Sequence, residues 1–213
     1  ASVTDAQNRT TYYQYDDDGN NTLIIRPDKE KIVIGYDNNL PVSITDPNKN
    51  IWMQTWNGKG QLQKQTSPSG AETQFRYNKA GDLVSSMDAG GHETHFKTGD
   101  LGRIESVTNE KGHKTKFTHD ALGNITETED AEGNRTTYTY DRKSRLTQVE
   151  KPSGACIFCK YDGQDNLISY QDENGHTTRF QYTITDKIAK KINPDQTEIF
   201  YTYDTEDQLI SLK

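Results

Sequence analysis

A unit of 21 residues recurs through this chain, and its fixed period decides which folds are open to it. Eight consecutive units run from Asp46 to Lys213 without an insertion, and the clearest copy is 130–150, DAEGNRTTYTYDRKSRLTQVE. A fixed period of this length indicates a repeat protein in which each unit packs on its neighbours. The units begin at Asp46, Ser67, Asp88, Asn109, Asp130, Lys151, Asp172 and Asn193.

Two looser copies occupy residues 1–45, one of them about one residue short near 38–41. We therefore expect a single array over residues 1–213, with two irregular repeats in 1–45 and eight regular repeats in 46–213. Residues 23–25 and 32–34 are the most aliphatic runs, and we expect this part to pack against elements outside the sequence given. The chain begins in mid-pattern, without Met or a signal peptide, so we expect a fragment of a larger protein.

The middle of each unit alternates polar residues with threonine and aromatic residues. In the copy at 130–150 the alternating residues are Thr136, Tyr138 and Tyr140, which predicts a strand with one apolar face. A motif of the form Asp-x-x-Gly follows, as in 120–123, and is typical of a hairpin loop whose glycine is left-handed. An aliphatic residue two positions later begins the second strand. It is Leu62, Leu83, Ile104, Ile125, Leu146, Leu167, Ile188 or Leu209.

The odd length of the unit constrains how the strands pair. A shift of one residue moves every side chain to the other face, so one loop must be odd and the other even unless an extra bulge intervenes. A three-residue loop inside the unit pairs Tyr140 with Leu146, and Tyr138 then shares their face. A four-residue loop between units, 130–133, pairs Ile125 with Tyr138. These loops predict aromatic and aliphatic residues in alternation across the sheet.

The composition favours one thin layer over a thick core. Only 30% of the residues are hydrophobic, and the mean hydropathy is −1.02. We expect an all-β fold, a long antiparallel meander of hairpins with two strands per unit. Ten units give about twenty strands, and open sheets rarely exceed about ten without curling. The meander must therefore curl or spiral around a large space.

The net charge argues against nucleic acid and anionic membranes as partners, and the short apolar runs argue against a membrane span. A net charge of −7 and a pI near 5.3 give no electrostatic footprint for nucleic acid or an anionic membrane. No apolar run is long enough to span a bilayer. We expect neither a nucleic-acid partner nor a membrane span in these residues.

The runs Gly133-Asn-Arg-Thr-Thr-Tyr-Thr-Tyr-Asp141 and Tyr161-Asp162-x-x-x-Asn166-Leu167 resemble the tyrosine–aspartate (YD) repeats of the Rhs family. The family includes bacterial Rhs polymorphic toxins, the C component of ABC toxins and the animal teneurins. The resemblance implies a β-sheet wound into a hollow shell, which in bacterial members encloses a C-terminal toxin domain. It also implies a protein that is secreted or delivered by a secretion system, in several members type VI. The sequence departs from the pattern at 98–100 and at Thr183.

Two cysteines form the motif Cys156-x-x-Cys159. Residues three apart in a strand point to opposite faces, which opposes a shared metal or a disulfide between them. Cys159 occupies an aromatic position, so packing is the favoured interpretation. A redox or zinc role is the alternative, and zinc would need two further ligands.

Three histidines, His92, His113 and His176, hold the fifth position of their units, just after the turn glycine. Solvent-facing turn residues explain them better than a metal ladder, because metal ligands must converge on one centre. His95 and His119 lie at strand positions without an acidic partner at fixed spacing.

The run Asp16-Asp-Asp-Gly-Asn20 has a weak likeness to a calcium loop but lacks the closing Glu, so a hairpin turn is favoured over cation binding. The many carboxylates follow the repeat and form no unique cluster. We therefore expect no catalytic, cofactor-binding or metal-binding residues, no cofactor and no enzymatic activity.

Three functions remain to be compared. The favoured one is a structural section of a β-shell of an Rhs-type secreted toxin that encapsulates a C-terminal toxin domain. Its expected partners are the rest of that shell, the enclosed toxin domain and secretion-apparatus proteins. The alternative is a cell-surface repeat module that binds carbohydrate or protein, and the third is a polysaccharide hydrolase, which would need an asymmetric acidic cleft. Open sheet edges would favour self-association or pairing with neighbouring units.

Overall fold

The computed structural model describes residues 1–213, and strands joined by short loops make up nearly all of them. The chain divides into two compact units, Ala1–Gly112 and His113–Lys213. The first holds β1 (Ser2–Thr4), β2 (Thr10–Tyr15), β3 (Asn21–Ile25), β4 (Lys31–Asp37), β5 (Leu40–Thr45), β6 (Ile51–Trp56), β7 (Leu62–Thr66), β8 (Glu72–Tyr77), β9 (Leu83–Met87), β10 (Glu93–Thr98) and β11 (Ile104–Thr108). The second holds β12 (Lys114–His119), β13 (Ile125–Glu129), β14 (Arg135–Tyr140), β15 (Leu146–Glu150), β16 (Cys156–Tyr161), β17 (Leu167–Gln171), β18 (Thr177–Tyr182), β19 (Ile188–Ile192), β20 (Glu198–Tyr203) and β21 (Leu209–Leu212).

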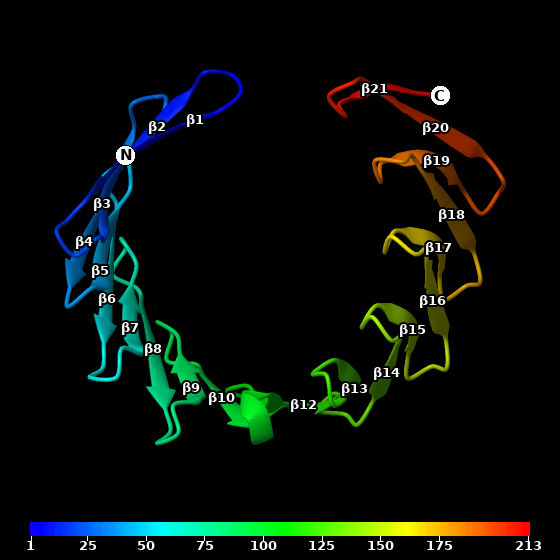
Figure 1. Cartoon of the computed structure of the whole chain (residues 1–213). Coiled ribbons are helices and arrows are strands. Elements are labelled where there is room, and N and C mark those ends of the chain that lie inside the picture. The colour runs from blue at the N-terminus through cyan, green and yellow to red at the C-terminus, as the bar shows by residue number, and fades with distance from the viewer. The chain divides into compact units, whose positions relative to one another are not determined.

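In each compact unit every strand pairs antiparallel with the strand next to it in the sequence. Figure 1 shows the strands of each unit side by side in chain order, along a ribbon that bends. The predicted all-β meander, with two strands per 21-residue repeat, is confirmed. No helix of the structure has the length and apolar character needed to cross a membrane.

One kind of loop closes both the hairpins inside a repeat and the hairpins between repeats. In the loop Asp141–Arg145, inside a repeat, the first N–H donates to the fifth carbonyl oxygen at 3.0 Å, and the fourth N–H donates to the first carbonyl oxygen at 3.0 Å. The loop Asp130–Asn134, between repeats, shows the same two bonds at 3.0 and 3.1 Å. The fourth residue is left-handed, as predicted for Gly123, whose φ is 98°. The four-residue loop expected between repeats is therefore wrong.

The register follows from one extra residue in the second strand of each repeat. Tyr140 pairs with Leu146 as predicted, but the register shifts next to that pair, and Tyr138 faces Val149. The shift is a β-bulge that leaves Thr147 without a partner. Because both loops are odd, this bulge restores the faces at each new repeat.

The predicted face of the repeat is confirmed, and the predicted neighbour across repeats is corrected. Tyr138 shares the face of Tyr140, and hence of Leu146. Between repeats, however, the register of β13 and β14 places Thr128 opposite Thr136, so Ile125 is not the partner of Tyr138. The strict alternation of aromatic and aliphatic residues across the sheet is wrong for this step.

The irregular loops lie where the sequence departs from the pattern. The short copy near residue 38 forms a two-residue loop, in which Asp37 pairs with Leu40 and both Asn38 and Asn39 have positive φ, at 49° and 62°. The other loops of residues 1–45 follow the common pattern. These loops establish the strand register of residues 1–45, which could not be assigned from the sequence.

The second departure, at 98–100, contains the one helical turn, a 3₁₀ turn over Asp100–Gly102. Gly99 stands where most other loops inside the repeats begin with Asp or Asn. A Cβ built on Gly99 would lie 2.0 Å from Oε1 of Glu105, so the Glu105 side chain occupies the space of the missing one. A side chain at residue 99 would have to displace this flexible carboxylate.

The sheet has no apolar core. No hydrophobic side chain is fully buried, and the buried polar residues are Ser85 and Ser106, each 4% exposed. A single layer leaves both faces of the sheet in contact with solvent, which accounts for the low hydrophobic content.

Candidate functional site

The loops inside the repeats lie along one edge of each compact unit, which we call the turn edge. Each loop follows the first strand of a repeat, and the side chains that link one repeat to the next gather there. The turn edge comprises 16–20, 37–40, 57–61, 78–82 and 99–103 in the first unit and 120–124, 141–145, 162–166, 183–187 and 204–208 in the second.

In five repeats the tyrosine that ends the first strand fastens the repeat to the one before it. The Tyr140 hydroxyl donates to the carbonyl oxygen of Ile125 at 2.9 Å, and the Tyr161 hydroxyl donates to that of Leu146 at 3.0 Å. The accepting residue begins the bulged strand, where the ladder with the following strand has stopped. The same bond joins Tyr77 to Leu62, Tyr182 to Leu167 and Tyr203 to Ile188, and the indole N–H of Trp56 donates to Pro41.

Burial favours the protonated, donating form of three of these hydroxyls. Desolvation raises the pKa of Tyr140, Tyr161 and Tyr182 above the ordinary tyrosine value. Thr98 holds the tyrosine position in its repeat and is too short to make the bond. The tyrosine bond is therefore missing from the repeat that also contains the 3₁₀ turn, and the following repeat has His119 in place of the tyrosine.

A carboxylate or amide opens most of the loops inside the repeats and stiffens them. Oδ1 of Asp120 accepts the backbone N–H groups of Leu122 and Asn124, both at 2.9 Å, and its Oδ2 accepts the Asn124 side-chain amide at 2.8 Å. The Asn124 side-chain hydrogen bond lowers the pKa of Asp120. The carboxylate thus serves as a permanent acceptor within its own loop.

Side chains of one loop also bond to the next loop along the edge. Gln61 donates to the carbonyl oxygen of Gly81 at 2.8 Å, and Asn166 donates to Asp186 at 2.8 Å. Further bonds of this kind join Asn20 to Asn39, Asn124 to Ser144 and Thr185 to Asp207.

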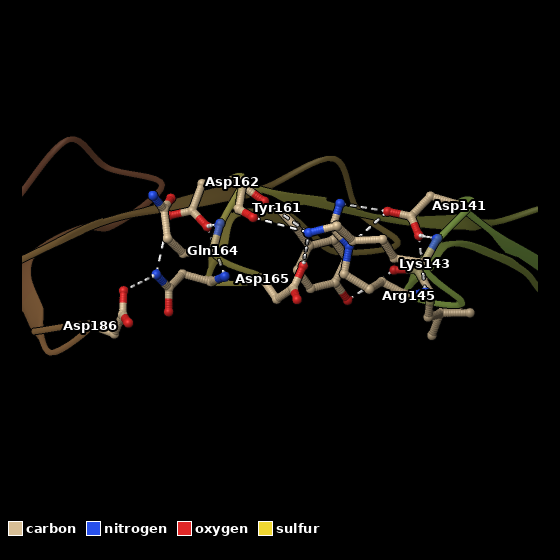
Figure 2. A network of polar contacts seen from close by, with 11 residues as sticks. Asp141, Lys143, Arg145, Tyr161, Asp162, Gln164, Asp165 and Asp186 are labelled. Atoms are coloured by element: carbon tan, nitrogen blue, oxygen red, sulfur yellow. Dashed lines mark hydrogen bonds and ion pairs between the residues drawn. The ribbon is translucent and has the colours of Figure 1, made fainter.

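Arg145 makes the densest set of these contacts (Figure 2). Its guanidinium pairs with Asp141 of its own loop at 2.6 Å and with Asp165 of the next loop at 2.7 Å. It also donates to the carbonyl oxygen of Asp162 at 2.8 Å and lies 4.8 Å from the centre of the Tyr161 ring. One side chain thus joins two repeats through charge, hydrogen bonds and a cation–π contact.

The charges in this network stabilise one another. The Arg145 hydrogen bond lowers the pKa of Asp141, and the Asp141 hydrogen bond raises the pKa of Arg145. Lys143 pairs with Asp165 at 2.8 Å, and this hydrogen bond is the main cause of the lowered pKa of Asp165. The opposite charges of Asp141, Arg145 and Asp165 thus favour the ionised form of each group, which suits a fastening between repeats.

The two cysteines lie on the same strand, β16, and pair with residues of different neighbouring strands. Cys156 pairs with Glu150 and Cys159 pairs with Tyr170, and both thiols are free. Cys159 is half-buried on the face of Tyr161, and desolvation raises the pKa of its thiol. A raised pKa leaves it protonated, which fits packing better than reactivity.

His92 and His176 serve the loops between repeats. His92 Nδ1 lies 3.0 Å from Asp88 Oδ2, and His176 Nδ1 lies 3.3 Å from Asp172 Oδ2, as the Asn side chain does at the same position elsewhere. His95 Nε2 lies 3.7 Å from Glu93 on the open strand surface.

The acidic run that begins at Asp16 forms a loop of the common kind. Oδ1 of Asp16 accepts the N–H groups of Asp18 and Asn20 at 3.1 and 2.8 Å. No three His, Cys, Asp or Glu side chains of the chain converge on one point suited to a metal ion.

The sequence indicated the loops but not the bonds between them. Arg145, Lys143 and Gln61 were not singled out, because their partners lie about one repeat away and differ in residue type from loop to loop. The recurring Tyr-Asp pair did carry a signal for the tyrosine bonds. Its tyrosine recurs at a fixed position of the repeat, and each of the five Tyr-to-carbonyl bonds spans the same 15 residues.

Comparison with protein families gives one match. The RHS Repeat model matches residues 56–94, 100–135, 119–155 and 161–198, which together cover more than half of the chain. A search of curated proteins found no match.

Solved structures share the fold. A Photorhabdus luminescens Tc holotoxin pore with a TccC3 variant has a TM-score of 0.62 and 17% identity, with 96% of this chain and 14% of that chain covered. A crystal structure of TcdB2-TccC3 has a TM-score of 0.61 and 17% identity, with 100% of this chain and 15% of that chain covered. The present chain thus spans about one seventh of the length of these relatives.

Proposed function

This chain belongs to the RHS repeat family, and from that premise we propose that it is a structural section of a β-shell that encloses a toxin domain in an Rhs-type secreted protein. The observation that carries the proposal is the absence of an apolar core in a sheet whose repeats are fastened by side chains. A layer of this kind separates two volumes of solvent. Its stability comes from contacts between successive repeats, so it needs no second layer.

The proposed partners are the remainder of the same shell, the enclosed toxin domain and the apparatus that delivers the protein. The likeness to chains of a Tc holotoxin and of TcdB2-TccC3 supports a toxin-related shell. Delivery by a secretion system belongs to the same proposal.

We also propose that these residues have no catalytic activity. At the turn edge, carboxylates such as Asp120 and Asp141 are committed to backbone and side-chain donors of their own loops. An acid or base in catalysis needs a free position beside the reacting atoms.

The test uses the full-length parent protein and limited proteolysis. Leu146→Asp and Leu167→Asp place charges on the half-buried face at the positions whose carbonyls receive the tyrosine bonds. We expect the intact array to protect the downstream domain and the double variant to release it to the protease. Leu122→Asp is the matched control, because that side chain is 72% exposed in a loop.

Equal exposure of the downstream domain in the parent and in the double variant would contradict enclosure. Protection in the parent and in Leu122→Asp, with loss in the double variant, supports it.

A further inference from the structure

Two cations without an acidic partner stand close together on one face of the second compact unit, Lys160 on β16 and Arg179 on β18. Both side chains are exposed, and neither makes an ion pair or a side-chain hydrogen bond. Ser169 of β17 pairs with Lys160 on one side and with Arg179 on the other. Directly paired residues point to the same face of a sheet. The three side chains therefore form a row of cation, serine and cation across three strands.

The same kind of row occurs four repeats earlier in the sequence, with an anion in place. There Ser85 pairs with Arg76 and with His95, and the Glu93 carboxylate lies 3.2 Å from Arg76 and 3.7 Å from His95. Hydrogen bonding from the Ser85 side chain is the main cause of the lowered pKa of Glu93, and the charges of His95 and Arg76 lower it further. A carboxylate from the chain itself thus joins the three members of the earlier row.

The later row lacks this carboxylate. The residue equivalent to Glu93 is Thr177, which is short and uncharged. Ser85, in contact with Glu93, is 4% exposed, whereas Ser169 is only half-buried. The later row therefore keeps the two cations and the hydroxyl, and it leaves open the place that a carboxylate takes in the earlier one.

The spacing of the strands suits an anion above Ser169. Strands about 4.8 Å apart put the Cα atoms of Lys160 and Arg179 about 10 Å apart, with the short serine side chain between them. The two long side chains can meet over that serine and donate charge-assisted hydrogen bonds to one carboxylate. Phe158 precedes Lys160 by two residues on the same face and is 38% exposed, so an apolar surface lies beside the row.

We propose that Lys160, Ser169 and Arg179 bind a carboxylate from a protein partner, in an acidic side chain that stands next to an apolar residue of that partner. The carboxylate follows from the earlier row, in which the occupant is a glutamate. The apolar neighbour follows from the exposed ring of Phe158. The site needs only β16, β17 and β18, so it is independent of whether the array encloses a toxin domain.

The test is a nuclear magnetic resonance titration of the isotope-labelled chain at low salt, because contacts between exposed charges are weak and are screened by salt. The probe is the capped peptide acetyl-Gly-Leu-Glu-Leu-Gly-amide, and the control peptide has Gln in place of Glu. We expect saturable shifts of the Lys160, Ser169 and Arg179 amides at millimolar Glu peptide and none with the Gln peptide. The absence of saturable shifts, or equal shifts at Lys31, an exposed lysine of β4, overturns the proposal.

A pair of variants supplies the missing carboxylate either at the row or away from it. Thr177→Glu restores the residue type found at Glu93, whereas Thr55→Glu adds the same charge at an exposed strand position of the first compact unit. We expect Thr177→Glu to weaken binding of the Glu peptide at least about fivefold, as for one lost hydrogen bond. We expect Thr55→Glu to leave it nearly unchanged, and equal weakening by the two variants overturns the proposal.

Glutarate, a free dicarboxylate, separates a protein partner from a small acid. We expect glutarate to shift the same three amides with weaker affinity than the Glu peptide, because it has no apolar side chain to place against Phe158. Affinity for glutarate equal to that for the peptide overturns the assignment to a protein partner. In the Phe158→Ser variant the peptide should lose its advantage over glutarate, and an advantage that persists overturns the role of the ring.

Discussion

In five repeats the hydroxyl of the tyrosine that ends the first strand does more than fill space on one face of the sheet. In Tyr140 it meets the carbonyl oxygen of Ile125 at 2.9 Å, where the strand ladder has ended. Removing it leaves a part-buried carbonyl without its donor. We expect Tyr140→Phe to lower the free energy of unfolding by about 1 kcal/mol, measured by urea denaturation.

The neighbouring Tyr138 provides the control for that measurement. Its hydroxyl has only a long contact of 3.4 Å with the Thr128 hydroxyl. We expect Tyr138→Phe to cost clearly less than Tyr140→Phe. Equal losses in the two variants would show that the hydroxyl bond to the backbone has no special weight.

Glycine is required at some loop positions and only tolerated at others. Gly123 has a φ of 98°, whereas Gly163 is not left-handed and a Cβ there would meet nothing within 4 Å. A β-branched residue resists positive φ. We expect Gly123→Val to cost about 1 kcal/mol or more and Gly163→Val to change the melting temperature little. The reverse order would contradict the loop geometry.

At the scale of the loop and the hairpin, charge pairs make the fastening sensitive to pH. The Arg145 hydrogen bond holds the folded-state pKa of Asp141 below its ordinary value, near 3.9 in an unfolded chain. The stabilisation from this carboxylate is therefore present above about pH 4. It is lost as the pH falls through the lowered folded-state pKa.

Asp141→Asn should reveal this dependence. An asparagine keeps the loop acceptor, as Asn57 and Asn78 do in their loops, but cannot pair with Arg145. We expect a lower melting temperature than the parent at neutral pH and a difference that shrinks on acidification. Asp17→Asn, at a side chain without an ion pair, is the control. A difference that stays constant from neutral to acid pH would contradict the assignment.

The hairpins of the fold could be predicted from the sequence because their signals are local. The run from Asp120 to Gly123 marks a loop, and Ile125 marks the start of a strand, with no knowledge of distant residues. The bulge could not be predicted in this way. Its unpaired residue is Gln63, Thr147 or Ala189 in different repeats, and no side-chain property unites them. The error in the register between repeats has this cause.

The links along the turn edge were equally hidden from the sequence. Gln61 bonds to a backbone oxygen, Asn124 to a serine and Arg145 to an aspartate, each about 20 residues away. Only the folded hairpins bring these partners together. The residues first considered as sites, including Cys159 and His92, were recognisable by type but have structural roles in packing and loop closure.

At the scale of the whole molecule, the absence of an apolar core changes how stability is distributed. Each strand pairs only with its sequence neighbours, and no hydrophobic side chain is fully buried. In a repeat array of this kind, stability is close to a sum of repeat terms and nearest-neighbour terms. A local defect should then remain local, in contrast to a globular domain that unfolds as one unit.

Native-state hydrogen exchange tests this directly with Tyr77→Phe, which removes the bond to the Leu62 carbonyl at 3.0 Å. We expect amide exchange to accelerate in β7 and β8 and in the strands beside them, because their local opening becomes easier. Exchange in β16–β19 should stay at the parent rate, since none of those strands pairs with the altered repeat. Tyr182→Phe should produce the reciprocal pattern, with faster exchange in β17 and β18, whose bond to Leu167 it removes. A uniform acceleration across both sets of strands in either variant would mean that the array opens as one cooperative unit and that fastening between neighbours does not govern its stability.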